Sequence, residues 1–272
     1  MSLLRLKRRQ FLQTSTALTL GALAPRLTGA PTEPSLPVGP FQCMGLRIGE
    51  VSEGTAYVWT RLTAASTRNE QGTVIPKRGK EDKKRGKGES KVTEPVDGLS
   101  GACPGAAGQV RLRYSLKEDL IDAVTMPVMT AAAAHDYISL FKLTGLQPGA
   151  TYYCISEVMG PQGALVAGAV RGRFETAPLP DTPSRLRFCV MTCQGYADRG
   201  HPDGHDIYPA MAAFRPQFTC LTGDLVYYDS GDPDAVNVRL ARYHWERMFS
   251  LPRLVAFNSN HSTYWLKDDH DT

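Results

Sequence analysis

The sequence predicts two folded modules, an antiparallel β-sandwich followed by a parallel α/β sheet. Between residues 41 and 180, short alternating apolar runs recur between Gly- and Pro-containing turns, which is typical of an antiparallel sandwich. The proline-rich stretch APLPDTPS at 177–184 indicates a boundary. Beyond it, strand-like runs alternate with helical ones, which favours parallel strands joined by crossover helices. A length of 272 residues agrees with about two domains.

Residues 1–30 have the pattern of an export signal and are set apart from the fold. Basic residues precede a modest apolar stretch, and Thr28-Gly29-Ala30 resembles a cleavage site. The pair Arg8-Arg9 followed by Gln10-Phe11-Leu12 resembles the twin-arginine signal. We therefore expect the twin-arginine export machinery as a partner and a periplasmic or other extracytoplasmic location. An ordinary Sec signal or a basic amphipathic N-terminus is the alternative.

Residues 41–180 supply the strands of the sandwich. GLRIGEVSEGTAYVWTRL alternates on both sides of a turn at Ser52-Glu53-Gly54, and QVRLRYSL, HDYISLFKLTGLQPGATYYCISEVM and AGAVRGRFETAP complete the set. The phrase LTGLQPGATYY resembles the corner of fibronectin type III domains. In that corner a tyrosine hydroxyl hydrogen-bonds to the backbone, so Tyr152 or Tyr153 is expected to be structural.

Residues 66–108 interrupt the sandwich and are predicted to form a disordered, basic insert. They are polar, Gly-rich and lysine-rich, a composition that buries little apolar surface. Lys77 to Lys91 holds eight basic and three acidic residues, whereas the whole chain has a net charge of +4. Because the rest of the chain is nearly neutral, no specific nucleic-acid binding is expected. A solvated loop is the simplest interpretation, and a patch that attracts phosphates is the alternative.

The α/β module is predicted from residue 185 onward. RLRFCVMTC is expected to be a buried strand, HDIYPAMAAF a helix limited by Pro209, and PQFTCLTGDLVYYD a second strand and loop. DAVNVRLARYHWERMFS is expected to be a helix capped by Asp234, with Val236, Val238, Leu240, Tyr243 and Met248 as packing residues. STYWLKDDHD is the third strand and its outgoing loop.

Polar side chains follow each of these three strands. Cys193 and Gln194 end the first, Asp224 and Tyr227 follow the second, and residues 268–271, Asp-Asp-His-Asp, follow the third. Adjacent parallel strands lie about 4.8 Å apart, so these groups converge at one edge of the sheet. Clustered acids raise one another's pKa unless a cation neutralises them. The pattern therefore predicts a metal site.

Taken in order, FCVMTCQGY, CLTGDLVYYD and TYWLKDDHD resemble the PhoD-like alkaline phosphatases of the calcineurin-like metallophosphoesterase superfamily. The preceding sandwich, with YVWTRL and LTGLQPGATYY, is similar to the N-terminal domain of that family. The resemblance implies Fe³⁺ and Ca²⁺ as cofactors and a phosphate ester as substrate. It further implies Cys193 as an iron ligand, Asp224 as the bridging ligand, Tyr227 as a phenolate on the ferric ion and Asp269 as another ligand. His270 is then the catalytic residue, a hydrogen-bond donor to phosphoryl oxygens that binds no metal.

The resemblance implies hydrolysis of phosphomonoesters, phosphodiesters or both. It also implies an incomplete metallophosphoesterase domain at 185–272, because that family has a longer domain with further ligands. We therefore expect a fragment with weak metal binding and little or no activity alone. The alternative is an exported, non-catalytic β-sandwich binding module with a vestigial phosphatase segment.

Several other residues have simpler interpretations. Cys189 and Cys220 are expected to be buried apolar residues, Tyr228 a packing residue and Asp268 and Asp271 solvated or capping acids. Gln194 is either a neighbour of the ligands or a polar loop residue. A disulfide among Cys43, Cys103 and Cys154 is open, without a defined pairing. Four histidines match no motif: His201, His205, His244 and His261.

Overall fold

The structure, a computed structural model, describes residues 39–76, 92, 95–160, 163, 165, 166, 168–230 and 232–272. The predicted export signal at residues 1–30 and the basic run at residues 77–91 lie outside this described part. Within it, no helix is both long enough and apolar enough to cross a membrane.

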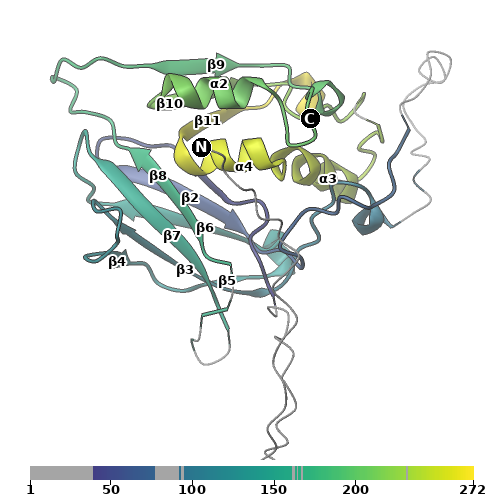
Figure 1. The fold of residues 1–272 in the computed structure, drawn as a ribbon, viewed down its shortest axis with the longest axis horizontal. Coiled ribbons are helices and arrows are strands. Elements are labelled where there is room, and N and C mark those ends of the chain that lie inside the picture. Colours follow the sequence, from purple (N-terminus) through teal and green to yellow (C-terminus); the bar gives the residue numbers. More distant parts are fainter. Residues whose placement is uncertain are drawn as a thin grey trace, which may run out of the picture. The chain divides into compact units, whose positions relative to one another are not determined.

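The described residues form two sheets (Figure 1). The six-stranded sheet has the order β6-β2-β1-β11-β10-β9, and the other has the order β4-β3-β7-β8 with β5 also pairing with β3. The strands of the first module are β1 (Leu46–Gly49), β2 (Thr55–Arg61), β3 (Gly108–Ser115), β4 (Val124–Thr125), β5 (Met129–Ala131), β6 (Ile138–Thr144), β7 (Thr151–Met159) and β8 (Val170–Glu175). Those of the second are β9 (Phe188–Met191), β10 (Phe218–Thr222) and β11 (Ser262–Leu266).

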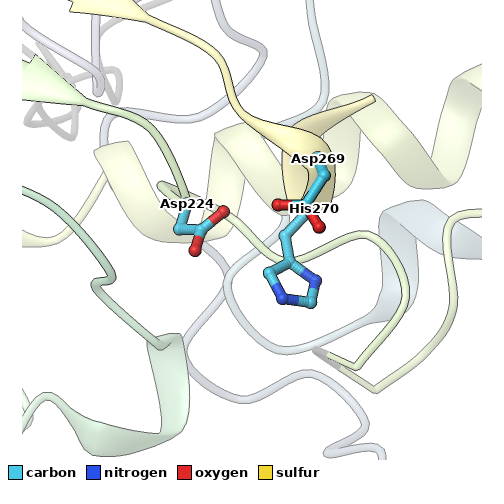
Figure 2. A group of neighbouring side chains, drawn as sticks. All are labelled: Asp224, Asp269 and His270. Carbon is cyan, nitrogen blue, oxygen red and sulfur yellow. The ribbon is translucent and has the colours of Figure 1, made fainter.

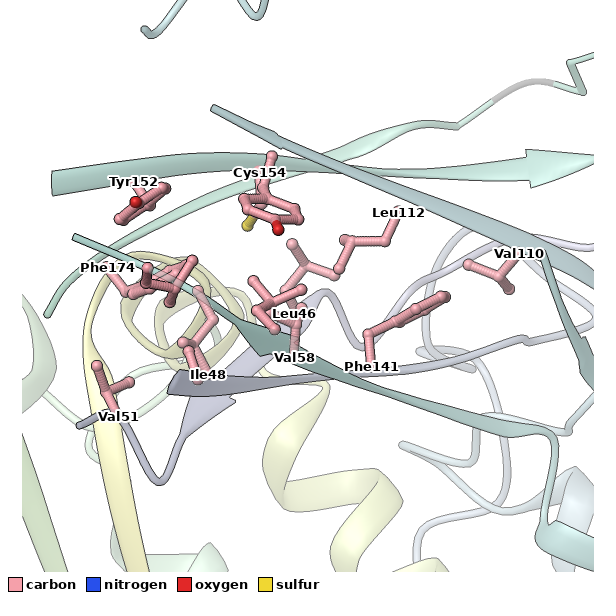
Figure 3. Close-up of a cluster of buried hydrophobic side chains, with 14 of the residues drawn as sticks. Leu46, Ile48, Val51, Val58, Val110, Leu112, Phe141, Tyr152, Cys154 and Phe174 are labelled. Atoms are coloured by element: carbon pink, nitrogen blue, oxygen red, sulfur yellow. The ribbon is translucent and has the colours of Figure 1, made fainter. Parts of the chain in front are cut away.

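The predicted antiparallel sandwich is present in residues 41–175. Strands β1, β2 and β6 face β3, β7 and β8, and alternate residues of both sheets point inward, as the sequence pattern requires (Figure 3). Leu46, Ile48 and Val58 meet Leu112 and Phe174 in this core, and all five are nearly inaccessible to solvent. Full burial of each such side chain contributes about 1.5–3 kcal/mol.

The predicted tyrosine corner is formed by Tyr152. Its ring is buried and stacks on Phe174, with ring centroids 5.5 Å apart. The backbone N–H of Gln147 donates a hydrogen bond of 2.8 Å to the Tyr152 hydroxyl oxygen. This bond fixes the connection between β6 and β7, while Tyr153 on the other face of the strand is less buried.

The second module contains the predicted parallel strands, and it extends the sandwich instead of standing apart from it. β9, β10 and β11 pair in parallel, and β11 also pairs in parallel with β1 at Ser262 and Ile48. The expectation that 185–193 forms a buried strand is wrong. β9 lies at the end of the sheet order, and Phe188 and Val190 are 52% and 59% exposed. Cys189 and Cys220 are consequently half-buried.

The helices follow the predicted order, with changes at their ends. They are α2 (Ile207–Phe214), α3 (Val238–Phe249) and α4 (Pro252–Asn260), and the short 3₁₀ helices are η1 (Val96–Gly98), η2 (Ala133–His135), η4 (Tyr196–Asp198) and η5 (Asp269–Asp271). Asn237, and not Asp234, caps α3, since its side-chain oxygen accepts from the N–H of Leu240 at 2.9 Å. Because α3 begins only at Val238, Val236 and Val238 are exposed, whereas the other three expected packing residues are buried.

Helix α4 was absent from the sequence prediction, although Pro252 at its first position is a common start signal. It packs against β1, β8 and α2 (Figure 1). The Ser259 hydroxyl accepts from the Leu46 N–H at 3.1 Å and donates to the Leu46 carbonyl at 3.2 Å. Gly172 permits this approach, because a Cβ there would lie 2.4 Å from the Ser259 carbonyl oxygen. The helix therefore fastens the second module to the sandwich.

The prediction of a disordered insert at 66–108 is wrong for both of its ends. Leu99 and Ala102 are fully buried against Tyr243 of α3, and Arg68 is 9% exposed. The average composition of the insert does not indicate the burial of these few apolar residues, because they pack against a helix that lies about 140 residues later in the chain. The lysine-rich centre, residues 77–91, and residues 93 and 94 lie outside the described part.

A buried ion-pair network joins the insert, the sandwich and α3. The Glu246 carboxylate of α3 accepts from Arg61 Nη2 at 3.3 Å, from Arg239 Nη1 at 2.9 Å and from the Cys103 N–H at 3.0 Å. Arg61 of β2 also pairs with Asp136 at 3.0 Å. The side chains of Arg61 and Glu246 are only 4% and 3% exposed. Burial raises the pKa of Glu246, and the neighbouring arginines oppose that shift.

The three cysteines considered for a disulfide are free thiols, and two of them are neighbours. Thr63 pairs with both Phe41 and Gly105, which brings Cys43 and Cys103 together. Their side chains hydrogen-bond, which lowers the pKa of the Cys43 thiol. Cys154 is buried in the sandwich core, where burial raises its pKa to about 12.

We expect a mild disulfide oxidant to link Cys43 to Cys103 and to leave Cys154 as a thiol, because only the first two are in contact. Non-reducing peptide mapping by mass spectrometry checks this result. A Cys103→Ser variant is the control, since it removes the linked peptide while keeping Cys154. Recovery of a peptide that contains Cys154 in a disulfide would contradict the prediction.

Candidate metal centre

The loops that follow β9, β10 and β11 are joined by backbone hydrogen bonds. The N–H of Cys193 donates to the Gly223 carbonyl at 3.2 Å, and that of Gln194 donates to the Asp224 carbonyl at 3.0 Å. The N–H of Tyr228 donates to the His270 carbonyl at 2.7 Å. These bonds align the three carboxyl ends of the parallel strands, which is where chemistry is expected in such sheets.

The structure brings the predicted site residues together from these loops. Cys193 Sγ lies 3.3 Å from Asp224 Oδ2, and the ring of Tyr227 stacks on that of His270 with centroids 4.7 Å apart. Asp224, Asp269 and His270 each offer a ligand atom within 4.8 Å of the others. Figure 2 shows Asp224 in the loop after β10, facing Asp269 and His270 of η5. All five predicted residues therefore belong to one cluster.

The backbone at these residues is strained. Cys193, Asp224 and Tyr227 have positive φ angles of 56°, 55° and 56°, a region that costs a non-glycine residue about 1–3 kcal/mol. Gly223 has φ of 101°, and a Cβ there would lie 2.4 Å from the Cβ of Asp268. Strain of this kind persists where the surroundings hold side chains in a functional arrangement.

The donor set fits a metal ion. Among the described residues, Asp224 Oδ1 is buried and has no hydrogen-bond partner, a condition that is rare for a carboxylate oxygen and that a cation would relieve. Burial, then the hydrogen bond and charge of Cys193, raise the pKa of Tyr227. A nearby cation opposes that effect and favours the phenolate. Thiolate, carboxylate and phenolate together suit a hard cation next to a softer transition metal.

Asp271 anchors the loop that carries Asp224, and the expectation that it is solvated or a capping residue is wrong. It is fully buried, and both its carboxylate oxygens accept from the Leu225 N–H, at 2.9 and 3.0 Å. Oδ1 also accepts from the Val226 N–H at 2.9 Å. Asp268 does cap η5, accepting from the Asp269 N–H at 2.9 Å. From sequence alone, nothing separates these two aspartates.

Asp229 orients His270 and was not among the predicted site residues. Its Oδ1 lies 2.7 Å from His270 Nδ1. This hydrogen bond is the main reason that the pKa of His270 is raised. An acid five residues after Asp224 is the sequence signal that could have indicated it. With Nδ1 engaged by Asp229, Nε2 is the ring nitrogen that can contact a ligand.

His244 contacts the Val226 carbonyl of the loop that follows β10. It is fully buried, with Nδ1 3.1 Å from the Val226 carbonyl oxygen and Nε2 2.7 Å from that of Pro233. Arg247 Nη2 lies 3.1 Å from Nδ1, and because a guanidinium only donates, this contact favours the tautomer in which the Nε2–H donates to Pro233. In that tautomer Nδ1 gives no hydrogen to the Val226 carbonyl. Burial, followed by the charge of Arg247, lowers the pKa of His244 to about 4.

His244 is expected to make stability depend on pH. Below an unfolded-state pKa of about 6.5 the unfolded chain takes up a proton that the folded chain refuses until about pH 4. The contribution of His244 to the free energy of unfolding is therefore fully present above pH 6.5. It falls by about 1.4 kcal/mol per pH unit as the pH drops toward 4. Urea unfolding of the chain and of His244→Gln at pH 7 and 5 measures this. Equal pH dependence in the two proteins would contradict it.

The remaining candidates have structural roles. Tyr228 packs in the second core as expected, and its hydroxyl oxygen accepts from Trp245 Nε1 at 2.5 Å. Gln194 is buried and accepts from the Tyr208 hydroxyl at 2.7 Å. Of the four other histidines, none belongs to the metal-ligand group found among the described residues.

Comparisons with known proteins identify solved structures that have a similar fold. No family model matches the sequence, and no curated relative matches it. The solved structure of PhoD is similar with a TM-score of 0.59 at 18% identity, covering 89% of this chain and 40% of that one. The purple acid phosphatase PPD1 from yellow lupin (Lupinus luteus) seeds has a TM-score of 0.50 at 13% identity, covering 83% and 35%. These likenesses show a fold shared with these two proteins, and the chain spans less than half of the length of either one.

Proposed function

We propose that this chain is part of a metal-dependent phosphoesterase of the PhoD type that hydrolyses phosphomonoesters, phosphodiesters or both. The observation that carries the proposal is the buried, unpartnered Asp224 oxygen, which lies where three strand ends bring Cys193, Tyr227, Asp269 and His270 together. The fold shared with PhoD and a purple acid phosphatase supports it.

Four of these residues are proposed to hold the metals: Cys193, Asp224, Tyr227 and Asp269. We propose Fe³⁺ on the side of the thiolate and phenolate, and Ca²⁺ on the carboxylate side, because hard oxygen ligands suit calcium. Bound metal ions supply charge neutralisation for phosphoryl oxygens and a lowered pKa for water. The strained backbone holds the ligands in place before any ion arrives.

His270 is proposed to donate a hydrogen bond to the phosphoryl oxygens. Asp229 binds Nδ1, which holds the ring in one orientation and leaves Nε2–H as the donor. The hydrogen bond to Asp229 raises the pKa of His270, and an Nε2–H donor would stabilise the negative charge that develops on phosphoryl oxygens. Stacking on Tyr227 fixes the ring plane.

We propose that the chain is exported through the twin-arginine machinery to the periplasm or another extracytoplasmic compartment. This proposal rests on the sequence pattern of residues 1–30 alone. The adjacent Arg8-Arg9 and the weakly apolar stretch after them support this proposal.

Metal analysis after loading the purified chain with Fe³⁺ and Ca²⁺ tests the proposed centre. We expect bound metal in the unaltered chain and at least a tenfold loss of affinity in Asp224→Asn, which removes the charge of the buried ligand. Asp268→Asn is the matched control, because this neighbouring acid only caps η5.

Hydrolysis of a chromogenic phosphomonoester and of a diester is measured on the same preparations. Little or no turnover is expected of this chain alone, and any metal-dependent turnover identifies the reaction. Metal-free protein after loading, or equal metal contents in the Asp224 and Asp268 variants, would overturn the proposal. Binding of a polyanion by a chain that takes up no metal after loading would favour the binding-module alternative.

A further inference from the structure

A cavity of about 420 Å³ adjoins the candidate metal centre. Cys193 and Tyr227 form part of its wall, so it opens onto the proposed ligands. Other parts of the wall come from Tyr196 of η4, from Arg199 and from Arg247 of α3. The cavity therefore extends from the proposed metal ligands to a region lined by an aromatic ring and guanidinium groups.

Three guanidinium groups from distant parts of the chain surround Tyr196. Their carbons lie 5.7 Å from the ring centroid for Arg68, 4.3 Å for Arg199 and 4.7 Å for Arg247. Arg68 Nη2 donates to the Tyr196 hydroxyl oxygen at 2.5 Å, and Arg199 Nη1 donates to its carbonyl at 2.7 Å. We call Arg68, Arg199 and Arg247 the arginine cluster.

Two members of the arginine cluster, Arg68 and Arg199, each hold a buried donor without an acceptor in the described part of the chain. Among the described residues, Arg68 Nη1 and Arg199 Nε are buried and have no hydrogen-bond partner, and the Arg68 residue as a whole is 91% buried. A buried donor without a partner costs about 1–3 kcal/mol, and more when it is charged. Such a cost is expected where a ligand or water completes the hydrogen bonds.

Charge on the cavity wall does not cancel the cluster. Asp198 and Asp232 also line the cavity, and the Asp232 carbonyl accepts from Arg247 Nη1 at 2.7 Å. On the wall itself the guanidinium groups of Arg199 and Arg247 face these two carboxylates, and Arg68, which contacts Tyr196 and does not line the cavity, adds a third positive charge. Guanidinium groups bind phosphate and carboxylate oxygens with paired, planar hydrogen bonds. The side of the cavity away from the metal ligands is consequently suited to an anion.

We propose that the arginine cluster binds a second anionic group of the substrate, so that the preferred substrate is a phosphate ester bearing another phosphate. This rests on the proposed function, in which the first phosphoryl group occupies the metal centre. The rings of Tyr196 and Tyr243, with Val74 and Ile75 of the insert, give the organic part between the two anions an apolar wall. The insert thereby contributes to substrate choice.

The first experiment is calorimetric titration of the full chain with inorganic phosphate in EDTA, so that the cluster is tested without the metal centre. We expect Arg199→Gln to weaken phosphate binding about tenfold, whereas Arg199→Lys, which keeps the charge, retains most of it. Arg185→Gln is the control, because Arg185 is exposed before β9 and does not line the cavity. Equal unfolding curves of all variants establish that folding is unchanged.

The second experiment uses the metal-loaded chain and non-hydrolysable phosphonates. At least one α,ω-alkyl diphosphonate is expected to bind ten times more tightly than methylphosphonate. Arg199→Gln is expected to remove this difference in affinity without weakening the binding of methylphosphonate. Asp224→Asn should instead weaken methylphosphonate, leaving phosphate binding in EDTA intact. Phosphate binding unaffected by Arg199→Gln, or equally weakened by Arg185→Gln, would overturn the arginine cluster as an anion site. That result would leave the metal-centre proposal standing.

Discussion

Replacement of Asp271 by alanine is expected to lower the free energy of unfolding by about 3 kcal/mol and to weaken metal binding in the same variant. The fully buried carboxylate accepts from the N–H groups of Leu225 and Val226, and both groups lose this acceptor when it is removed. Both groups lie between Asp224 and Tyr227, so their loss of restraint releases two proposed ligands. Urea unfolding and metal analysis measure the two effects.

Asp271→Asn and Asp268→Ala sharpen this experiment. Asparagine keeps one acceptor oxygen, so an intermediate loss of stability is expected. Asp268 is exposed and makes one bond to a backbone N–H, so its removal should cost less than about 1 kcal/mol. Equal losses from the Asp268 and Asp271 alanine variants would show that Asp271 does not anchor the loop.

Replacement of Glu246 by alanine is expected to cost about 4 kcal/mol, the largest effect we anticipate for one side chain. The change leaves the buried guanidinium of Arg61 with Asp136 as its carboxylate partner and leaves the Cys103 N–H without its acceptor. It therefore loosens the insert, β2 and α3 together. Chemical unfolding provides the measurement, with the exposed Glu53→Ala as the matched control.

A double variant separates the network from simple loss of packing. If the cost arises from an uncompensated buried charge, Glu246→Leu combined with Arg61→Met should destabilise less than the sum of the two single changes. Strict additivity of the two costs would contradict the role assigned to the ion pair.

Local pattern was sufficient for the strands and for the position of the site. Alternation around Ser52-Glu53-Gly54 placed β1 and β2, and the polar residues after three apolar runs located Cys193, Asp224 and Asp269 at one sheet edge. Both features depend on short sequence separations, because a strand's pattern and the residue that ends it are neighbours in the chain.

Features that depend on distant partners were not predictable in this way. Asp271 and Asp268 have the same side chain in the same motif, yet only the former faces the N–H groups of another loop. Leu99 gains its burial from Tyr243, and β9 is exposed because it pairs on one side only. The spacing of Asp229 from Asp224 does not show which side chain it faces, and its distance to His270 assigns its role.

The parallel pairing of β1 with β11 has a consequence for how the chain folds. Ile48 lies opposite Ser262, and Leu46 shares two hydrogen bonds with Ser259, so each contact closes more than two hundred residues of chain. Contacts of this separation slow folding, because the entropy of closing the loop is lost before the contact forms. Among the described strands, the first to leave the ribosome, β1, is thus among the last to acquire its full set of neighbours.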